Sequence, residues 1–187
     1  MLRCAATELA PALRQRPTFY LTVNLPPAML TSGRASRALD AAPVGSPLTP
    51  DRLVFELTER QLLDGPADEV ACEMLGLRER GVRFGLDDFG TGYTSLSYLN
   101  KFHFDILKID TSFLPGPDRS EAAAAVLKSL IDLGTRLGLT LIAEGVEQPA
   151  QADALKGHGV PYAQGWLYSR ALPVADFLDR LKLGGEV

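Results

Sequence analysis

The chain has 187 residues, a formal net charge of −4 and 46% hydrophobic residues, the composition of a folded domain that buries a core of its own. This acidic balance argues against a surface that binds polymeric nucleic acid, although local cations can still hold a small anionic ligand. The two cysteines and two histidines have no spacing typical of zinc or redox sites, so a metal site would be built from oxygen ligands. No segment approaches the roughly 18 apolar residues of a membrane helix, and the expected location is the cytoplasm.

The sequence opens with a segment of helical character at Met1–Arg16 and then alternates short strand-like runs with helical spacing. The predicted strands are Phe19–Val23, Arg52–Leu57, Val82–Leu86, Asp105–Ile109, Thr140–Ala143 and Tyr162–Leu167. The predicted helices between and after them are Asp68–Arg80, Ser120–Leu137, Pro149–Lys156 and Val174–Leu183. Ser120 is the expected N-cap of the longest helix and Gly138 its expected stop.

The alternation of strands and helices predicts a parallel sheet covered by helices. About six strand–helix units are present, whereas a complete (β/α)₈ barrel has eight. Periodicity alone leaves an incomplete barrel and an open doubly wound sheet as alternatives. The segment Thr31–Pro50, rich in Gly, Pro, Ser and Ala, predicts a weakly structured connection or a short irregular helix.

Polar side chains follow nearly every predicted strand, and the carboxyl ends of parallel strands form the active-site edge of such folds. These residues are Asn24, Glu56, Glu59, Asp87, Asp88, Lys108, Asp110, Glu144, Glu147 and Gln164. Each alone is compatible with a strand-end charge, a helix cap or a turn, but so many converging carboxylates would repel one another. One or two Mg²⁺ or Mn²⁺ ions would offset that repulsion, activate a water and stabilise the leaving oxygen of a phosphodiester.

Asp87 and Asp88 are adjacent in the sequence, which restricts whether both side chains can point to the same site. Neighbouring residues on a regular strand point to opposite faces, so both carboxylates reach one site only if the strand ends or twists between them. Gly90 and Gly92 follow directly and permit such a change of direction. They also predict a mobile loop at Phe89–Leu96 that couples closure to the site.

These motifs resemble the EAL phosphodiesterases, which hydrolyse cyclic di-GMP to linear pGpG. The matching stretches occur in family order and cover almost the whole chain: Val23-Asn24-Leu25, Phe55-Glu56-Leu57-Thr58-Glu59, Leu86-Asp87-Asp88-Phe89-Gly90-Thr91-Gly92-Tyr93, Leu107-Lys108-Ile109-Asp110, Ala143-Glu144-Gly145-Val146-Glu147 and Gln164-Gly165. The resemblance implies a partial EAL domain over residues 1–187, with a TIM-like (β/α) barrel of about six of the eight strand–helix units.

The resemblance also implies a two-metal site and its ligands. Carried over by position, the residues that would bind two Mg²⁺ or Mn²⁺ ions are Asn24, Glu56, Asp87, Asp88 and Glu144. Asp87 would bridge the two ions. Lys108 would hold the nucleophilic water, and Glu144 is also the candidate base.

Three further residues have supporting roles by the same resemblance. Asp110 would support the metal site, and Gln164 would lie close to the ligand or a metal-bound water. Glu59 would anchor the Phe89–Leu96 loop. Because that loop contributes to dimerisation in the family, a homodimer or pairing with another EAL domain is expected.

The Glu-Ala-Leu segment that normally precedes the Asn24 strand has no counterpart in the sequence. Glu8-Leu9-Ala10 is in the wrong register and lacks the arginine two residues further on. The family glutamate is a metal ligand, so impaired activity is expected. Three interpretations follow: a piece of a genuine phosphodiesterase, a non-catalytic module that binds cyclic di-GMP or another EAL domain, and an unstable remnant without a function of its own.

Overall fold

A computed structural model describes residues 2–41, 45–63, 66–90, 99, 101–114 and 121–182. The chain forms two compact units, the first from residues 1–57, 61–83 and 171–187 and the second from residues 58–60 and 84–170. The expected N-cap Ser120 and most of the expected loop Phe89–Leu96 lie outside the described residues. In the described part of the chain, no helix is long and apolar enough to cross a membrane.

In the first unit, strands β1 (Leu21–Asn24) and β2 (Leu53–Thr58) pair in parallel, with Asn24 opposite Glu56 at their carboxyl ends. The apolar residues of β2 from Leu53 to Leu57 are fully buried, which is typical of a parallel strand covered on both faces. The helices of this unit are α1 (Leu2–Glu8), α2 (Ala10–Gln15), α3 (Pro27–Thr31), α4 (Arg34–Asp40), α6 (Ala67–Glu79) and α10 (Val174–Lys182), with a 3₁₀ turn at Pro50–Arg52. A further short helix, α5 (Glu59–Leu63), follows β2.

The predicted N-terminal helix is interrupted, and the reason is local. Pro11 lies in the first turn of α2 and has no N–H to continue the hydrogen bonding of α1. Of the two alternatives predicted for Thr31–Pro50, the structure has a short helix, α4, which begins after Gly33. Gly33 itself has a left-handed conformation (φ 62°). The Ser36 hydroxyl of α4 donates to Glu73 Oε1 of α6 at 2.7 Å.

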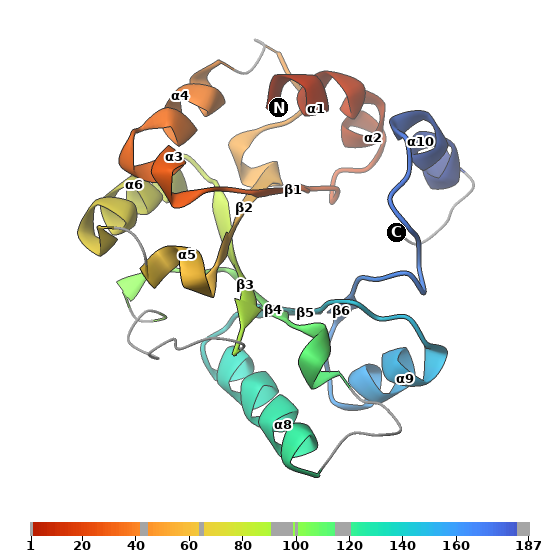
Figure 1. Ribbon diagram of the computed structural model, residues 1–187. Coiled ribbons are helices and arrows are strands. Elements are labelled where there is room, and N and C mark those ends of the chain that lie inside the picture. The colour runs from red at the N-terminus through yellow and green to blue at the C-terminus, as the bar shows by residue number, and fades with distance from the viewer. Residues whose placement is uncertain are drawn as a thin grey trace. The chain divides into compact units, whose positions relative to one another are not determined.

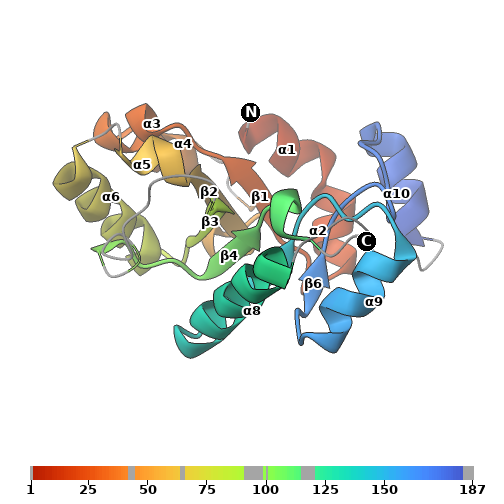
Figure 2. The same ribbon diagram turned by 60° about the horizontal axis from the view of Figure 1, so that its bottom comes forward.

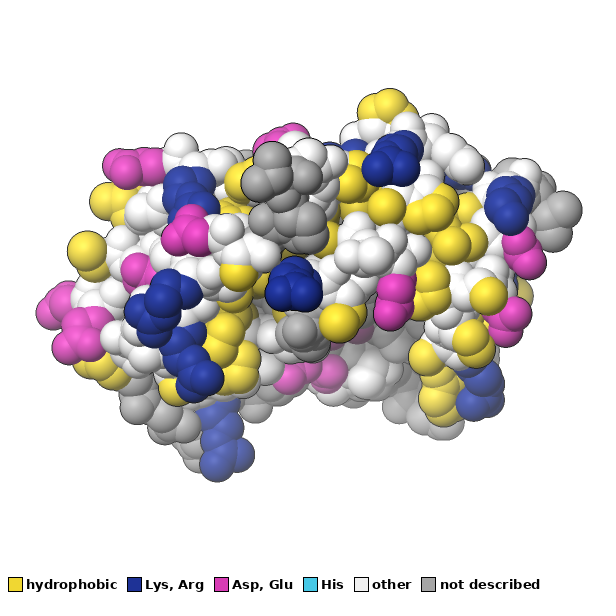
Figure 3. All heavy atoms as spheres, turned by 90° about the horizontal axis from the view of Figure 1, so that it is seen from above, with side chains coloured by type: hydrophobic (Ala, Val, Ile, Leu, Met, Phe, Trp, Pro, Cys, Tyr) yellow, Lys and Arg dark blue, Asp and Glu magenta, His cyan; other side chains and the backbone are white. Residues whose placement is uncertain are grey.

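The C-terminal helix α10 packs beside the N-terminal α2 within this unit, as Figure 1 shows. Arg16 Nη2 donates to the carbonyl of Leu181 at 2.8 Å, and the rings of Phe19 and Phe177 lie 5.9 Å apart between centroids. On the face of the molecule shown in Figure 3, basic, acidic and hydrophobic side chains are interspersed.

Arg52 connects several backbone segments of the first unit by hydrogen bonds. Its guanidinium donates to four backbone carbonyls: those of Phe19 at 2.8 Å, Leu13 at 2.6 Å, Arg16 at 2.5 Å and Pro47 at 3.4 Å. Replacing Arg52 by alanine is expected to lower the free energy of unfolding by roughly 3 kcal/mol, because several charged hydrogen bonds, most of them partly buried, are lost. Urea unfolding measures this change. Arg52→Lys, which lacks the planar guanidinium and its several N–H donors, should retain only part of the lost stability. An unchanged unfolding midpoint in Arg52→Ala would refute the assignment.

In the second unit, strands β3 (Arg83–Phe89, within this unit from Phe84 on), β4 (Ile106–Ile109), β5 (Thr140–Ala143) and β6 (Tyr162–Ala163) are parallel and neighbours in that order. The intervening elements are the 3₁₀ turn η2 (Thr111–Phe113), α8 (Glu121–Arg136) and α9 (Pro149–Gly157). Figures 1 and 2 show α8 and α9 on the same side of these strands. The predicted alternation of parallel strands and helices is confirmed in this unit.

Helix α8 lies close to β5 because Gly134 presents no side chain at the contact. A Cβ there would collide with the side chain of Leu141. The helix buries Leu127 and Ile131 on the same side. It ends as predicted before Gly138, which has a left-handed φ of 70°.

The sixth strand is shorter than the predicted run Tyr162–Leu167. The chain leaves the sheet after Ala163 because Gly165 passes directly against the backbone of Val146, where a Cβ would collide with main-chain atoms. The carbonyl of Val146 accepts from Leu167, and Tyr168 donates to the carbonyl of Gly165 at 3.1 Å to close a turn. The apolar character of this segment therefore does not extend the strand.

Candidate metal and catalytic site

An acidic cluster lies in the second unit at the carboxyl ends of β3 and β5. Asp87, Asp88 and Glu144 each offer a carboxylate oxygen, and these oxygens lie within 4.8 Å of one another. Asp87 is buried and the other two are half-buried. Carboxylate oxygens at this spacing fit a hard divalent cation such as Mg²⁺ or Mn²⁺.

A bulge in β3 allows the neighbouring aspartates to join one cluster. Leu86 pairs with Leu107 and Phe89 pairs with Ile109, so β3 has one more residue than β4 over this stretch. The bulge contains Asp88, whose backbone is in a left-handed conformation (φ 54°). Aspartate tolerates this conformation better than most residues. The expected irregularity between the two aspartates is confirmed.

Lys108, on β4, lies inside this cluster. Its Nζ is 2.5 Å from Glu144 Oε1 and 3.3 Å from Asp87 Oδ1. The lysine side chain is only 5% exposed. A buried ammonium ion requires such partners, and here it offsets part of the carboxylate charge.

The cluster shifts the titration of two of its carboxyl groups. Burial raises the pKa of Glu144 to about 7 and outweighs the neighbouring ammonium of Lys108, which lowers it, while Asp87 raises it further. Burial also raises the pKa of Asp88, and the charges of Asp87 and Asp110 act in the same direction. Glu144 can therefore exchange a proton near neutral pH.

The raised pKa of Glu144 makes cation binding dependent on pH. Between its ordinary pKa of 4.5 and about 7, the folded chain holds more protons than the unfolded chain, so the free energy of unfolding of the metal-free chain should fall as pH rises through this window. Mn²⁺ affinity should rise over the same window because binding displaces the proton. Calorimetry in buffers of different ionisation enthalpy measures the released protons. Glu144→Gln should release fewer, whereas equal release from both proteins would contradict this account.

Three predicted supporting residues have defined contacts in this unit. Gln164 Nε2 donates to Glu144 Oε1 at 2.5 Å and so helps to orient that carboxylate. Asp110 Oδ1 accepts from the backbone N–H of Ser112 at 2.8 Å and caps η2. Glu59, only 2% exposed, accepts from the N–H of Gly90 at 3.0 Å, at the start of the expected mobile loop. Their functional roles stay predictions.

The other two predicted ligands belong to the first unit. Asn24 and Glu56 are register partners at the carboxyl ends of β1 and β2, and the carbonyl of Glu56 accepts from the N–H of Leu25 at 2.8 Å. Asn24 is exposed, whereas Glu56 is 5% exposed. The structure thus brings these two residues to the same edge of their strand pair. Their role as metal ligands stays a prediction.

Sequence reasoning missed one residue next to the cluster. Trp166 follows Gln164 and Gly165, and its side chain is 58% exposed. The only sequence signal was an aromatic residue two positions after Gln164, inside the predicted strand Tyr162–Leu167. Its exposure depends on the turn after β6.

The family profile of the EAL domain matches residues 1–171. The chain belongs to the EAL domain family. The probable cyclic di-GMP phosphodiesterase PdeB of Escherichia coli (strain K12) is 39% identical over 178 residues, which are 95% of this chain and 33% of PdeB. The crystal structure of the EAL domain of Mycobacterium smegmatis DcpA has a TM-score of 0.87 at 30% identity and covers 100% of this chain and 83% of that one. Klebsiella pneumoniae BlrP1, solved as a manganese and cyclic di-GMP complex, has a TM-score of 0.77 at 30% identity. The match covers 88% of this chain and 42% of the BlrP1 chain.

These findings confirm the predicted family and fold class. In the part of the chain that the structure describes, six parallel strands alternate with helices. They belong to an EAL-type TIM-like barrel that is incomplete relative to the eight units of a full barrel. The interpretation of residues 1–187 as one partial domain stays a prediction. This EAL domain spans about a third of the length of PdeB.

Proposed function

We propose that this EAL domain hydrolyses cyclic di-GMP to linear pGpG with the help of Mg²⁺ or Mn²⁺. The observation that carries the proposal is a buried lysine enclosed by carboxylates, Lys108 against Asp87 and Glu144, beside a third carboxylate from Asp88. PdeB, to which the chain is similar, is named for this activity, and BlrP1 was solved with manganese and cyclic di-GMP.

The residues of the cluster have complementary chemical roles in this reaction. A bound cation would lower the pKa of a water molecule and offset charge on the phosphate. Lys108 would orient that water and stabilise the negative charge that builds up on the phosphate oxygens. With a pKa of about 7, Glu144 can accept the proton of the water at neutral pH. The water oxygen forms a bond to phosphorus as one phosphodiester P–O bond breaks, and the leaving sugar oxygen gains a proton.

The remaining predicted site residues would bind or support the metal ions or hold the base in place. Asn24 and Glu56 would each supply an oxygen ligand to a metal ion, as would Asp87. Asp110 would support the metal site. Gln164, through its hydrogen bond to Glu144, would hold the base in place.

Hydrolysis is tested by incubating the purified chain with cyclic di-GMP and Mn²⁺ and separating the products by chromatography. Appearance of pGpG that is suppressed by EDTA supports the proposal. A folded chain that binds cyclic di-GMP without converting it would be a binding module instead, and a folded chain that does neither would overturn both functions. Sedimentation in the same buffer tests the expected homodimer.

A further inference from the structure

The 3₁₀ turn η2 follows β4, the strand of Lys108, and contacts the two segments that carry the carboxylates of the cluster. Asp110 holds the turn in place at the end of the strand. The side chain of Asp110 accepts from the N–H of Ser112 at 2.8 Å, and its carbonyl accepts from the N–H of Phe113 at 3.0 Å. The side chains of η2 therefore leave β4 in a defined direction.

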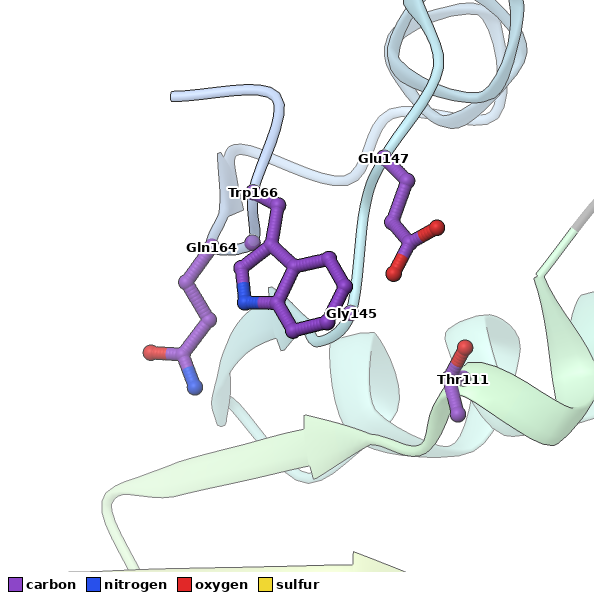
Figure 4. A pocket seen from close by; sticks show the side chains of 6 residues that line it. Thr111, Gly145, Glu147, Gln164 and Trp166 are labelled. Carbon is purple, nitrogen blue, oxygen red and sulfur yellow. The ribbon is translucent and has the colours of Figure 1, made fainter. Parts of the chain in front are cut away.

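One contact of η2 is with the segment that follows β5. A Cβ on Gly145, the residue after Glu144, would lie 2.8 Å from the Cβ of Thr111 in η2. Gly145 also has a left-handed φ of 63°. Figure 4 shows both residues in a pocket of about 420 Å³, whose other lining residues are Glu147, Gln164, Gly165 and Trp166. Because no side chain separates the two segments, a displacement of η2 would displace the backbone beside Glu144.

The other contact of η2 is with the segment that follows the bulge of β3. A Cβ on Gly90 would lie 3.1 Å from Cζ and 3.2 Å from Cε2 of Phe113, so the phenyl ring lies directly against the open face of this glycine. Leu130 of α8 lies next to the same place, at 3.7 Å. The N–H of Gly90 donates to the buried carboxylate of Glu59 at 3.0 Å. A hydrogen bond and a ring contact together fix this glycine.

The backbone of Asp88 explains why the position of Gly90 matters. Asp88 (φ 54°) and Gly90 (φ 92°) are both left-handed, and glycine alone adopts this conformation without steric cost. A residue with a side chain keeps such a conformation only where its surroundings hold it. On one side of Asp88, the carboxylate of Asp87 accepts its N–H at 3.0 Å. On the other side, Phe89 pairs with β4, and the chain then depends on Gly90 and the ring of Phe113.

We propose that Phe113 is a positioning residue of the cation site. By packing on Gly90, its ring holds the bulge in which Asp88 turns its carboxylate toward the cluster. Because the same short turn also packs on the residue after Glu144, η2 sets the spacing between these two carboxylates. The role requires no contact between the ring and a ligand. The inference rests on the cation site of the proposed function and does not require hydrolysis.

Two measurements on Phe113→Leu test this role. Leucine keeps an apolar side chain but does not extend as far as the ring carbon Cζ. Mn²⁺ binding, followed by electron paramagnetic resonance of the free ion, should weaken about tenfold, the lower end of the range of about 10–100-fold for residues that orient metal ligands. Amide hydrogen exchange at Gly90 in the metal-free chain should become faster, because its hydrogen bond to Glu59 opens more often. Phe113→Met, whose longer flexible side chain reaches further, should recover part of both.

Phe177→Leu is the matched control. Phe177 is also a half-buried phenylalanine, but it lies on α10 in the first unit, where its ring contacts Phe19. This substitution should lower the unfolding temperature and leave both the Mn²⁺ affinity and the exchange at Gly90 unchanged. A general loss of packing is thereby distinguished from a loss of position at the cation site.

A double-mutant cycle with Gly90→Ala isolates the contact between ring and backbone. In the wild-type background the added methyl group meets the ring of Phe113 and also strains a left-handed backbone, so Mn²⁺ binding should weaken. In the Phe113→Leu background the backbone strain is the same but the ring is absent. Gly90→Ala should then weaken Mn²⁺ binding by a factor about threefold or more smaller, as expected for residues in direct contact.

The outcomes distinguish this inference from the proposed function. Unchanged Mn²⁺ affinity in a folded Phe113→Leu chain would overturn the positioning role, and an equal loss of affinity in Phe177→Leu would do the same. Additive effects in the cycle would overturn the contact on which the role depends. The expected losses of affinity in a chain that binds Mn²⁺ but does not hydrolyse cyclic di-GMP would support the inference and overturn the proposed hydrolysis. A folded wild-type chain that does not bind Mn²⁺ would overturn both.

Discussion

Replacing Lys108 by methionine is expected to abolish cyclic di-GMP hydrolysis and, at the same time, to tighten the binding of Mn²⁺. The lysine Nζ lies 2.5 Å from Glu144 Oε1 and 3.3 Å from Asp87 Oδ1, where it repels a cation held by the same oxygens. Removing one positive charge at this range should raise Mn²⁺ affinity about tenfold or more, even if the interaction is screened as in water. Hydrolysis should fall about 10²–10³-fold or more, because a charge-stabilising donor is lost.

Mn²⁺ binding, measured by electron paramagnetic resonance of the free ion, tests the first half of this prediction without requiring turnover. Lys128→Met is the matched control, since it removes the same charge from an exposed position on α8. That control should leave both affinity and rate unchanged. Weaker Mn²⁺ binding in a folded Lys108→Met chain would show that the lysine does not compete with the ion, and retained hydrolysis would remove it from the mechanism.

Replacing Asp87 by asparagine is expected to eliminate both Mn²⁺ binding and hydrolysis. Asp87 is the buried member of the carboxylate cluster and pairs with Lys108. Loss of a partner outside the first shell of a metal typically costs about 10–100-fold in affinity, and loss of a direct ligand should exceed that. Asparagine has the same size and keeps an oxygen that can accept the N–H of Asp88, now 3.0 Å from Asp87 Oδ1.

Thermal unfolding separates loss of the ligand from loss of the fold. Mn²⁺ should raise the unfolding temperature of the wild-type chain, because it binds the folded state, and should leave that of Asp87→Asn unchanged. Asp132→Asn, an exposed position on α8, is the matched control and should behave as the wild type does. Undiminished stabilisation by Mn²⁺ in Asp87→Asn would place the ion elsewhere.

The two substitutions are most informative together, because they should abolish hydrolysis in opposite ways. The Lys108 variant binds the ion and cannot complete the reaction, whereas the Asp87 variant cannot hold the ion. General disruption of the site would weaken Mn²⁺ binding in both variants. Opposite changes in Mn²⁺ affinity would therefore assign charge compensation to the lysine and coordination to the aspartate.

Local signals in the sequence were sufficient for much of the fold. Buried parallel strands are continuous apolar runs, so strands such as β2 and β5 were predicted within one or two residues, and Gly138 marked the end of α8. The polar residue at the end of each strand was also visible, because the chain changes there from apolar to charged. The order of those motifs was enough to indicate the EAL family.

Other features depend on contacts between distant residues, and only the tertiary structure decided them. Lys108 and Glu144 meet because β4 and β5 pair in parallel, and the burial of Glu144 at this place raises its pKa despite the ammonium beside it. The end of β6 is set by the contact of Gly165 with Val146, which no local pattern predicts.

The sequence by itself determined the family, the order of strands and helices and the residue types of the site. The tertiary structure decided how those residues meet: the left-handed Asp88 that turns two adjacent carboxylates toward one cluster, the lysine between Asp87 and Glu144, and the pocket with the exposed Trp166. The physical reason is that residue type and periodicity depend on near neighbours along the chain. Charge compensation, burial and pocket shape depend on strand register and backbone approach between segments far apart in sequence.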